Sequence, residues 1–74
     1  MKYEFDVDFH VYKNVFCPAH WDSVRVICDE DNEYSAILIA RMRIKSEFDF
    51  PLHCINTYRV YRSHSDKLIC SLTL

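Results

Sequence analysis

An alternation of apolar and polar residues near the amino end limits the folds open to this chain more than any other feature of its sequence. Over residues 3–12 the side chains change character at nearly every step. The apolar positions are Tyr3, Phe5, Val7, Phe9 and Val11, and the polar positions between them are Glu4, Asp6, Asp8 and His10. A period of two residues is that of a β-strand, whose successive side chains point to opposite faces. The segment therefore predicts a strand with one buried face and one solvent-facing face.

Four later segments also favour extended structure, because they are rich in apolar and β-branched residues. These segments are residues 23–28, 34–45, 54–62 and 67–73, the last two joined by a turn at Ser63 to Asp66. Together with the first strand they predict a mainly β, possibly α+β fold. The expected form is a twisted antiparallel sheet or a small open barrel of about five strands, with at most one short helix.

The segment 34–45 is the part of the chain whose structure the sequence leaves open. Its centre, residues 36–40, is apolar at every position, which fits a strand buried on both faces; its length and its Ala, Leu, Met and Arg content also permit a helix capped near Asn32. Renewed alternation over residues 41–45 favours the strand. As a strand, the segment would place its basic residues on the sheet face that carries the acidic residues of the first strand. Those two sets are Arg41, Arg43 and Lys45, and Glu4, Asp6 and Asp8.

Two segments between the expected strands predict loops. Residues 13–22 lose the alternation, and Pro18 lacks a backbone donor, so a loop or a short helix is expected there. Residues 46–53 are expected to form a loop in which Phe48 and Phe50 plug one end of the sheet.

The composition excludes several classes of protein. Half of the 74 residues are apolar and no stretch resembles a linker, so a single domain spanning residues 1–74 is expected. Nine Lys and Arg against eleven Asp and Glu give a net charge of −2, which argues against a general polyanion binder. Acidic residues interrupt every candidate for a leader segment, and no apolar run is long enough to span a membrane. A cytoplasmic location is therefore expected.

The four cysteines are expected to be free thiols, because no export signal accompanies them. Cys28 and Cys70 lie among apolar neighbours and predict buried side chains. The other two lie near histidines, and a thiolate and an imidazole are ligands that zinc prefers. The candidate zinc ligands are Cys17, His20, His53 and Cys54, although their spacing is not that of the common zinc motifs. No other cofactor is expected.

Residues 58–62, Tyr-Arg-Val-Tyr-Arg, interleave aromatic and basic side chains, as proteins that bind single-stranded nucleic acid do. The alternative interpretation is a solvated face of ion pairs, in which the acidic residues of the first strand neutralise the basic ones. The second interpretation is favoured because the chain has no basic excess. Nucleic-acid binding and zinc binding are therefore secondary hypotheses.

No set of residues predicts an active site. The sequence has no nucleophile elbow or phosphate-binding loop, and it contains no glycine that would let backbone amides approach a substrate closely. The chain is therefore expected not to be an enzyme. The favoured interpretation is a small protein that binds a protein partner as an inhibitor or adaptor, of the kind that viruses and mobile elements encode against host machinery.

The candidate partner-binding residues are Trp21, Ile37, Ile39, Tyr58, Arg59 and Tyr61. Trp21, the sole tryptophan, predicts either a plug over one end of the sheet, which is favoured, or an interface anchor, because Trp is enriched at interfaces. Ile37 and Ile39 follow from the strand interpretation of residues 34–45, which leaves both faces of the sheet apolar at its middle. Few residues remain to cover the second face, so a homodimer or a complex with a target is expected.

Overall fold

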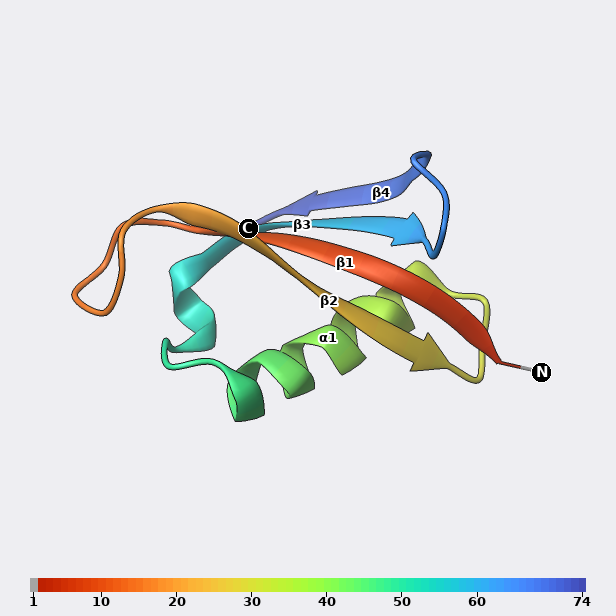
Figure 1. Ribbon diagram of the computed structural model, residues 1–74, viewed down its shortest axis with the longest axis horizontal. Helices are drawn as coiled ribbons and strands as arrows, with labels where there is room; N and C mark the ends of the chain where they lie inside the picture. Colours follow the sequence, from red (N-terminus) through yellow and green to blue (C-terminus); the bar gives the residue numbers. More distant parts are fainter. Residues whose placement is uncertain (1) are drawn as a thin grey trace.

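The chain folds as a four-stranded antiparallel sheet with one long helix packed against one face (Figure 1). The structure is a computed structural model, which describes residues 2–74. Its elements are β1 (Tyr3–Val11), β2 (His20–Cys28), α1 (Glu33–Glu47), a 3-10 turn η1 (Leu52–Cys54), β3 (Ile55–Arg62) and β4 (Leu68–Thr73). The strand order is β2-β1-β3-β4, so β2 and β4 are the two edges. Among the described residues, no helix is long and apolar enough to cross a membrane.

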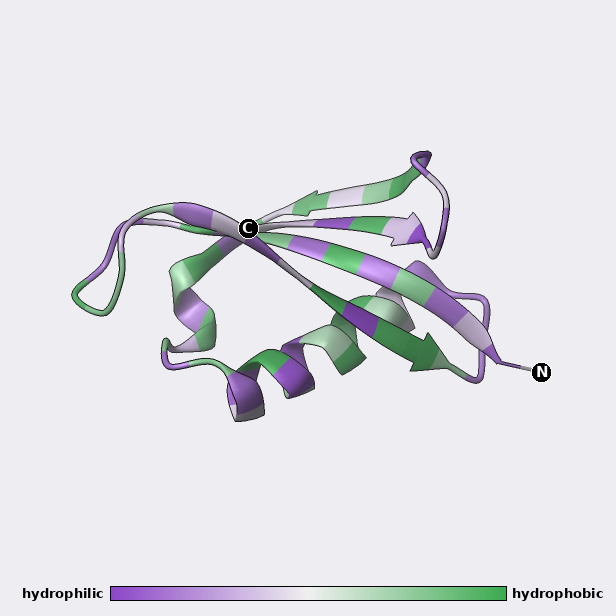
Figure 2. Ribbon diagram, viewed as in Figure 1, coloured by the Kyte–Doolittle hydropathy of each residue, from purple (hydrophilic) through white to green (hydrophobic). Residues whose placement is uncertain are grey.

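Strand β1 lies at the centre of the fold, and the alternation predicted for it is confirmed. Its odd-numbered side chains Phe5, Val7, Phe9 and Val11 are at most 1% exposed, whereas its polar side chains lie on the opposite face. Figure 2 shows the same alternation as green and purple bands along the strand. Val7 is paired with a valine on each side, Val24 of β2 and Val60 of β3. The strand thus joins both halves of the sheet to one apolar core.

Residues 34–45 form most of helix α1, so the strand predicted for them is wrong and the helical alternative is correct. Asn32 caps the helix: its side-chain oxygen accepts a hydrogen bond from the Tyr34 backbone N–H at 2.8 Å. The buried positions are Ala36, Ile37, Ala40 and Ile44, whose spacing of one, three and four residues is that of one helical face. The two alanines let the helix lie close to the sheet, and the apolar run 36–40 supplies that packing face.

The fold class predicted from the sequence is confirmed in its broad form, with two corrections. The protein is α+β with an open antiparallel sheet, but the sheet has four strands rather than about five, and its helix has 15 residues and is not short. A closed barrel does not form, because β2 and β4 lie at opposite edges. Residues 23–28 pair with β1 as part of β2, and the helix follows them in the chain.

The ion pairs expected across the sheet form with a different partner. Because Arg41, Arg43 and Lys45 are on α1, they do not share the sheet face of Glu4, Asp6 and Asp8, and that prediction is wrong. Arg25 of β2 takes their place. Its Nε lies 2.9 Å from Asp6 Oδ1 and 3.6 Å from Glu4 Oε1. The alternation of β2 places this arginine on the same face as the acidic row.

A cluster of three phenylalanines closes one end of the core, as expected for Phe48 and Phe50. Phe9 of β1 meets Phe48 edge-to-face, with ring centroids 5.5 Å apart, and Phe50 lies 6.2 Å from Phe9 and 5.6 Å from Phe48. Such pairs add to the stabilisation that burial of the rings provides. The cluster anchors the segment that leaves α1 to the end of the sheet.

The hairpin of β3 and β4 is also confirmed, and its turn shows how a chain without glycine changes direction. His64 adopts a positive φ of 65°, a conformation that His tolerates better than most residues. The Ser65 backbone N–H donates to the Arg62 carbonyl oxygen at 3.1 Å, and the Lys67 N–H donates to Ser65 Oγ at 3.1 Å. Side-chain and backbone hydrogen bonds thus fix the turn that glycine commonly makes.

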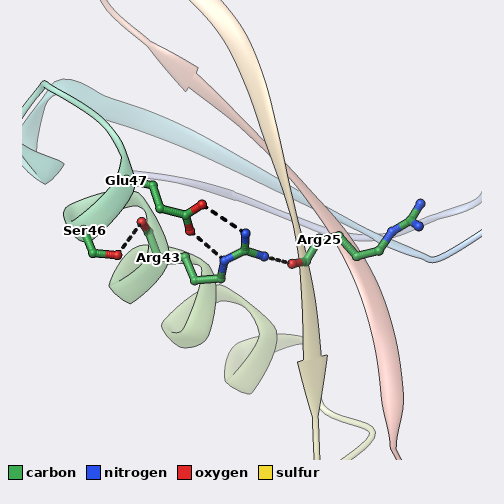
Figure 3. A network of polar contacts seen from close by, with 4 residues as sticks. All are labelled: Arg25, Arg43, Ser46 and Glu47. Atoms are coloured by element: carbon green, nitrogen blue, oxygen red, sulfur yellow. Dashed lines mark hydrogen bonds and ion pairs between the residues drawn. The ribbon is translucent and has the colours of Figure 1, made fainter.

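The two edges of the sheet differ in how they are covered. At the β2 edge, the Arg43 guanidinium of α1 donates a hydrogen bond to the backbone oxygen of Arg25, which points toward the helix (Figure 3). Glu47 holds that guanidinium in a two-point contact at 2.8 and 3.2 Å, and the hydrogen bond lowers the pKa of Glu47. Ser46 Oγ donates to the carbonyl oxygen of Arg43 at 3.1 Å. Helix α1 packs chiefly over β2, whereas the β4 edge lies away from it (Figure 1).

Candidate interaction surface

The sheet face opposite α1 carries an exposed tryptophan held in a fixed position. Trp21 is 47% exposed, and its register partner in β1 is His10, whose ring lies 5.1 Å away. His10 is in turn fixed by a 2.9 Å hydrogen bond between its Nδ1 and Asn56 Oδ1. From β3, the guanidinium carbon of Arg59 lies 4.5 Å from the Trp21 ring centroid, a cation–π contact. Three strands therefore contribute to holding one large aromatic side chain at the surface.

The loop between β1 and β2 presents two more apolar side chains at the same end of the sheet. Val15 is 94% exposed and Phe16 is 60% exposed. Asn14 organises the loop: its Oδ1 accepts from the Phe16 and Cys17 backbone N–H groups at 2.8 and 3.3 Å, and its Nδ2 donates to the Tyr12 carbonyl at 2.8 Å. An asparagine that bonds its own backbone in this way fixes a tight turn. The loop is consequently a preformed support for the two side chains at its tip.

Carboxylates line the middle of this face. Burial, followed by the nearby charge of Asp6, raises the pKa of Asp8, while Arg59 opposes this shift. Two open surface hollows lie on either side of Asp8. One, of about 360 Å³, is lined by Asp6, Asp8, Tyr61, Ser65 and Asp66, and the other, of about 280 Å³, by Asp8, Trp21, Asp22 and Ser23. Acidic groups and aromatic rings are thus adjacent along β1 and its neighbours.

The partner-binding residues predicted from the sequence separate into two groups. Trp21, Arg59 and Tyr61 lie on the helix-free face, where Trp21 and Arg59 are in contact. Tyr58 and Ile37 are 1% and 5% exposed, so we remove them from the candidate surface; both belong to the apolar core beneath α1.

Ile39 and Trp21 lie in different environments. Ile39 is half-buried and packs against the core, and its part in partner binding stays a prediction. The favoured interpretation of Trp21 as a plug is wrong, because the phenylalanine cluster fills that position and the tryptophan is exposed.

The four candidate zinc ligands lie in different environments. Cys54 is 2% exposed and His53 is exposed. His20 Nδ1 makes a 2.8 Å hydrogen bond with the Pro18 carbonyl, and Cys17 is half-buried beside Asn14. Within residues 2–74, no three His, Cys, Asp or Glu side chains are grouped as ligands of a metal ion. Zinc binding stays a prediction that metal analysis can test.

The four cysteines are free in the structure. Cys28 and Cys54 are buried, whereas Cys17 and Cys70 are half-buried. Burial is the main cause that raises the pKa values of Cys28 and Cys70, and nearby carboxylates add to it. A raised pKa keeps a thiol protonated and therefore weakly nucleophilic.

Two residues of this surface, Val15 and Phe16, were not among the predicted partner-binding residues. Both lie in an irregular segment where no periodicity indicates exposure, and Asn14, which fixes their backbone, was predicted only to lie in a loop. Asparagine is itself typical of turns, because its side chain can hydrogen-bond the backbone two residues further on. We define the hairpin-end surface, at the end of the sheet where the β1–β2 loop lies, as Val15, Phe16, Trp21 and Arg59.

The fold and this surface describe a small α+β domain with an open sheet face and a rigid apolar loop. Comparisons with protein-family models, with curated proteins and with solved structures found no match to the chain. The physical chemistry of the hairpin-end surface is therefore what indicates a function.

Proposed function

We propose that the protein is a non-catalytic, cytoplasmic inhibitor or adaptor that binds a protein partner through its hairpin-end surface, in the manner of small virus- or mobile-element-encoded proteins. The observation that carries the proposal is the position of Trp21, nearly half exposed on a helix-free sheet face and braced by His10 and Arg59. Tryptophan, tyrosine and arginine are the residues most enriched where alanine substitution costs most in protein interfaces. Trp21 and Arg59 are in contact here, and Tyr61 lies farther along the same sheet face.

Preorganisation supports the same proposal. Ordering a mobile side chain or loop on binding costs free energy, and a surface that is already fixed avoids much of that cost. The Trp21 ring is held between two neighbours, and Asn14 fixes the backbone that carries Val15 and Phe16. A rigid surface with an aromatic anchor and an apolar tip suits a partner that offers a complementary pocket.

The charge of this face favours a protein partner over a nucleic acid. An open sheet with exposed aromatic rings resembles the platforms on which single-stranded bases stack. Here, however, Glu4, Asp6 and Asp8 run along the central strand, and Arg25 is paired with two of them. A phosphate backbone laid across this face would meet carboxylates where such binders have Lys and Arg. The two hollows beside Asp8 are open depressions, which suits surface recognition better than an enclosed reaction.

Capture from lysate with matched variants tests the proposal. Immobilised wild-type protein should retain a specific protein that Trp21→Ala retains at least about tenfold less, because loss of an anchor residue costs about 2 kcal/mol or more. Ile27→Thr is the matched control: Ile27 is 59% exposed on the same strand, and threonine keeps the β-branched shape. Equal capture by wild type and Trp21→Ala would reject the hairpin-end surface. A mobility shift of labelled single-stranded RNA at micromolar protein would instead favour a nucleic-acid partner.

A further inference from the structure

The outer side of helix α1 carries a row of exposed apolar side chains. Tyr34, Leu38 and Met42 are 61%, 61% and 71% exposed, and their spacing of four residues aligns them along one side of the helix. The opposite side already packs Ala36, Ile37, Ala40 and Ile44 against the sheet. A surface helix ordinarily turns charged and polar residues outward, whereas this one is apolar on both sides. A single exposed leucine is ordinary, but three aligned side chains form a patch.

We propose that this stripe, defined as Tyr34, Leu38 and Met42, binds the same stripe of a second copy of the chain, with the two α1 helices antiparallel. The stripe is symmetric about Leu38, because its other two members each lie four residues away, about 6 Å along the axis. A two-fold axis at Leu38 therefore places the two leucines against each other. The same axis places Tyr34 of each copy against Met42 of the other, and a thioether packs favourably against an aromatic ring.

Charges at the two ends of the helix support the antiparallel direction. Glu30 lies just before the amino end of α1, and Lys45 lies in its last turn. Within residues 2–74, neither side chain is in an ion pair, and both are exposed. Antiparallel packing brings the acidic end of each copy to the basic half of the other and also opposes the helix dipoles. Parallel packing would bring like charges together.

The rest of the fold leaves the stripe accessible. The sheet lies on the other side of α1, and the hairpin-end surface is on the far face of that sheet (Figure 1). The dimer therefore does not rest on the proposed function, and either can fail without the other. One helix packed on one helix is a small interface for a specific complex, so we expect a dissociation constant of about 1–100 μM.

Sedimentation equilibrium of the full chain tests the inference. Wild type should change from the monomer mass of 8.9 kDa toward twice that value as its concentration rises. Leu38→Glu should stay monomeric up to about 200 μM, at least a 20-fold weakening, because it places a charge at the two-fold axis. Ile27→Glu is the matched control, with the same new side chain at a site of 59% exposure outside both surfaces, and it should dimerise like wild type. Far-UV circular dichroism should show that both variants are folded.

A charge exchange tests the direction of packing. Lys45→Glu and Glu30→Lys should each weaken the dimer by about fivefold, since each breaks an exposed ion pair twice per dimer. Mixing the two variants should restore the affinity, because both intermolecular pairs then have opposite charges. Three results would overturn the proposal: wild type that stays at the monomer mass to about 200 μM, Leu38→Glu that dimerises as wild type does, or a mixture no tighter than its components.

Discussion

Two alanine substitutions in the same helix are expected to differ strongly in their effect on stability. Ile44 is fully buried against the sheet, whereas Leu38 is 61% exposed on the outer side of α1. Both residues have even numbers, so a strand over residues 34–45 would place them on the same face and give them similar burial. The pair Ile44→Ala and Leu38→Ala therefore separates the helix from the strand by energetics alone.

The magnitude for Ile44→Ala follows from what the substitution removes. Three buried carbon atoms at about 0.8 kcal/mol each account for about 2.4 kcal/mol. The cavity left behind adds to this, and the observed range for such changes is about 2–5 kcal/mol. A chain of this length has a total stability of about 4–11 kcal/mol, so roughly half could be lost. Leu38→Ala should change stability by no more than about 0.5 kcal/mol, because its side chain is exposed and alanine favours the helix.

Urea unfolding followed by far-UV circular dichroism measures both effects. The experiment is run at about 1 μM protein, so that a dimer through Leu38 does not contribute. Thermal unfolding should show a midpoint about 6 °C lower for each kcal/mol lost, or about 12–30 °C lower for Ile44→Ala. Equal losses for the two variants, within about 0.5 kcal/mol, would refute the helical assignment and the packing derived from it.

Three further predictions concern a carboxylate, a loop and the thiols. Burial and Asp6 raise the pKa of Asp8, so the contribution of Asp8 to stability declines as pH rises from about 4 through the raised pKa of the folded state. Asp8→Asn should therefore increase the free energy of unfolding at pH 7, by less than about 1 kcal/mol. Urea unfolding should no longer detect this gain near pH 3. Asn14→Ala removes the hydrogen bonds that fix the β1–β2 loop, so it should cost about 1–2 kcal/mol and speed chymotrypsin cleavage there; unchanged cleavage would contradict this role. Alkylation without reductant should label Cys17 and Cys70 first and all four cysteines after unfolding, and mass spectrometry showing two labels or fewer in the unfolded chain would exclude free thiols.

The strands were predictable where only one of their faces is buried. In β1 and in the β3–β4 hairpin, apolar and polar residues alternate because one side meets the core and the other meets solvent. Helix α1 was not predictable in this way, because residues 36–40 are apolar at every position and show no helical or strand period. The alternation over residues 41–45 arose by coincidence: Ile44 faces the sheet, but Met42 lies on the outer side of the helix. The cap at Asn32 was the better signal.

The candidate surface was predictable only in part, for a related reason. Strand parity alone separates Tyr58 from Arg59 and Tyr61, because alternate residues of β3 face the core and the solvent. The contact of Trp21 with Arg59 depends on the position of β1 between β2 and β3, and that order is a long-range property. No local pattern in residues 20–28 or 55–62 contains it. The sequence therefore identifies the side chains but does not predict that Trp21 and Arg59 are in contact.

The contact of Arg43 with the backbone of β2 affects how copies of this sheet can be joined. An open sheet with two free edges can add the first edge of one molecule to the last edge of the next, and such head-to-tail addition has no natural end. Here the guanidinium occupies an acceptor that an incoming strand would need, and Glu47 keeps it in place. Strand addition is thereby directed to β4, where an uncharged segment from Leu68 to Thr73 is open. One arginine therefore makes the two edges of the sheet unequal, and this difference works against head-to-tail growth of a fibre.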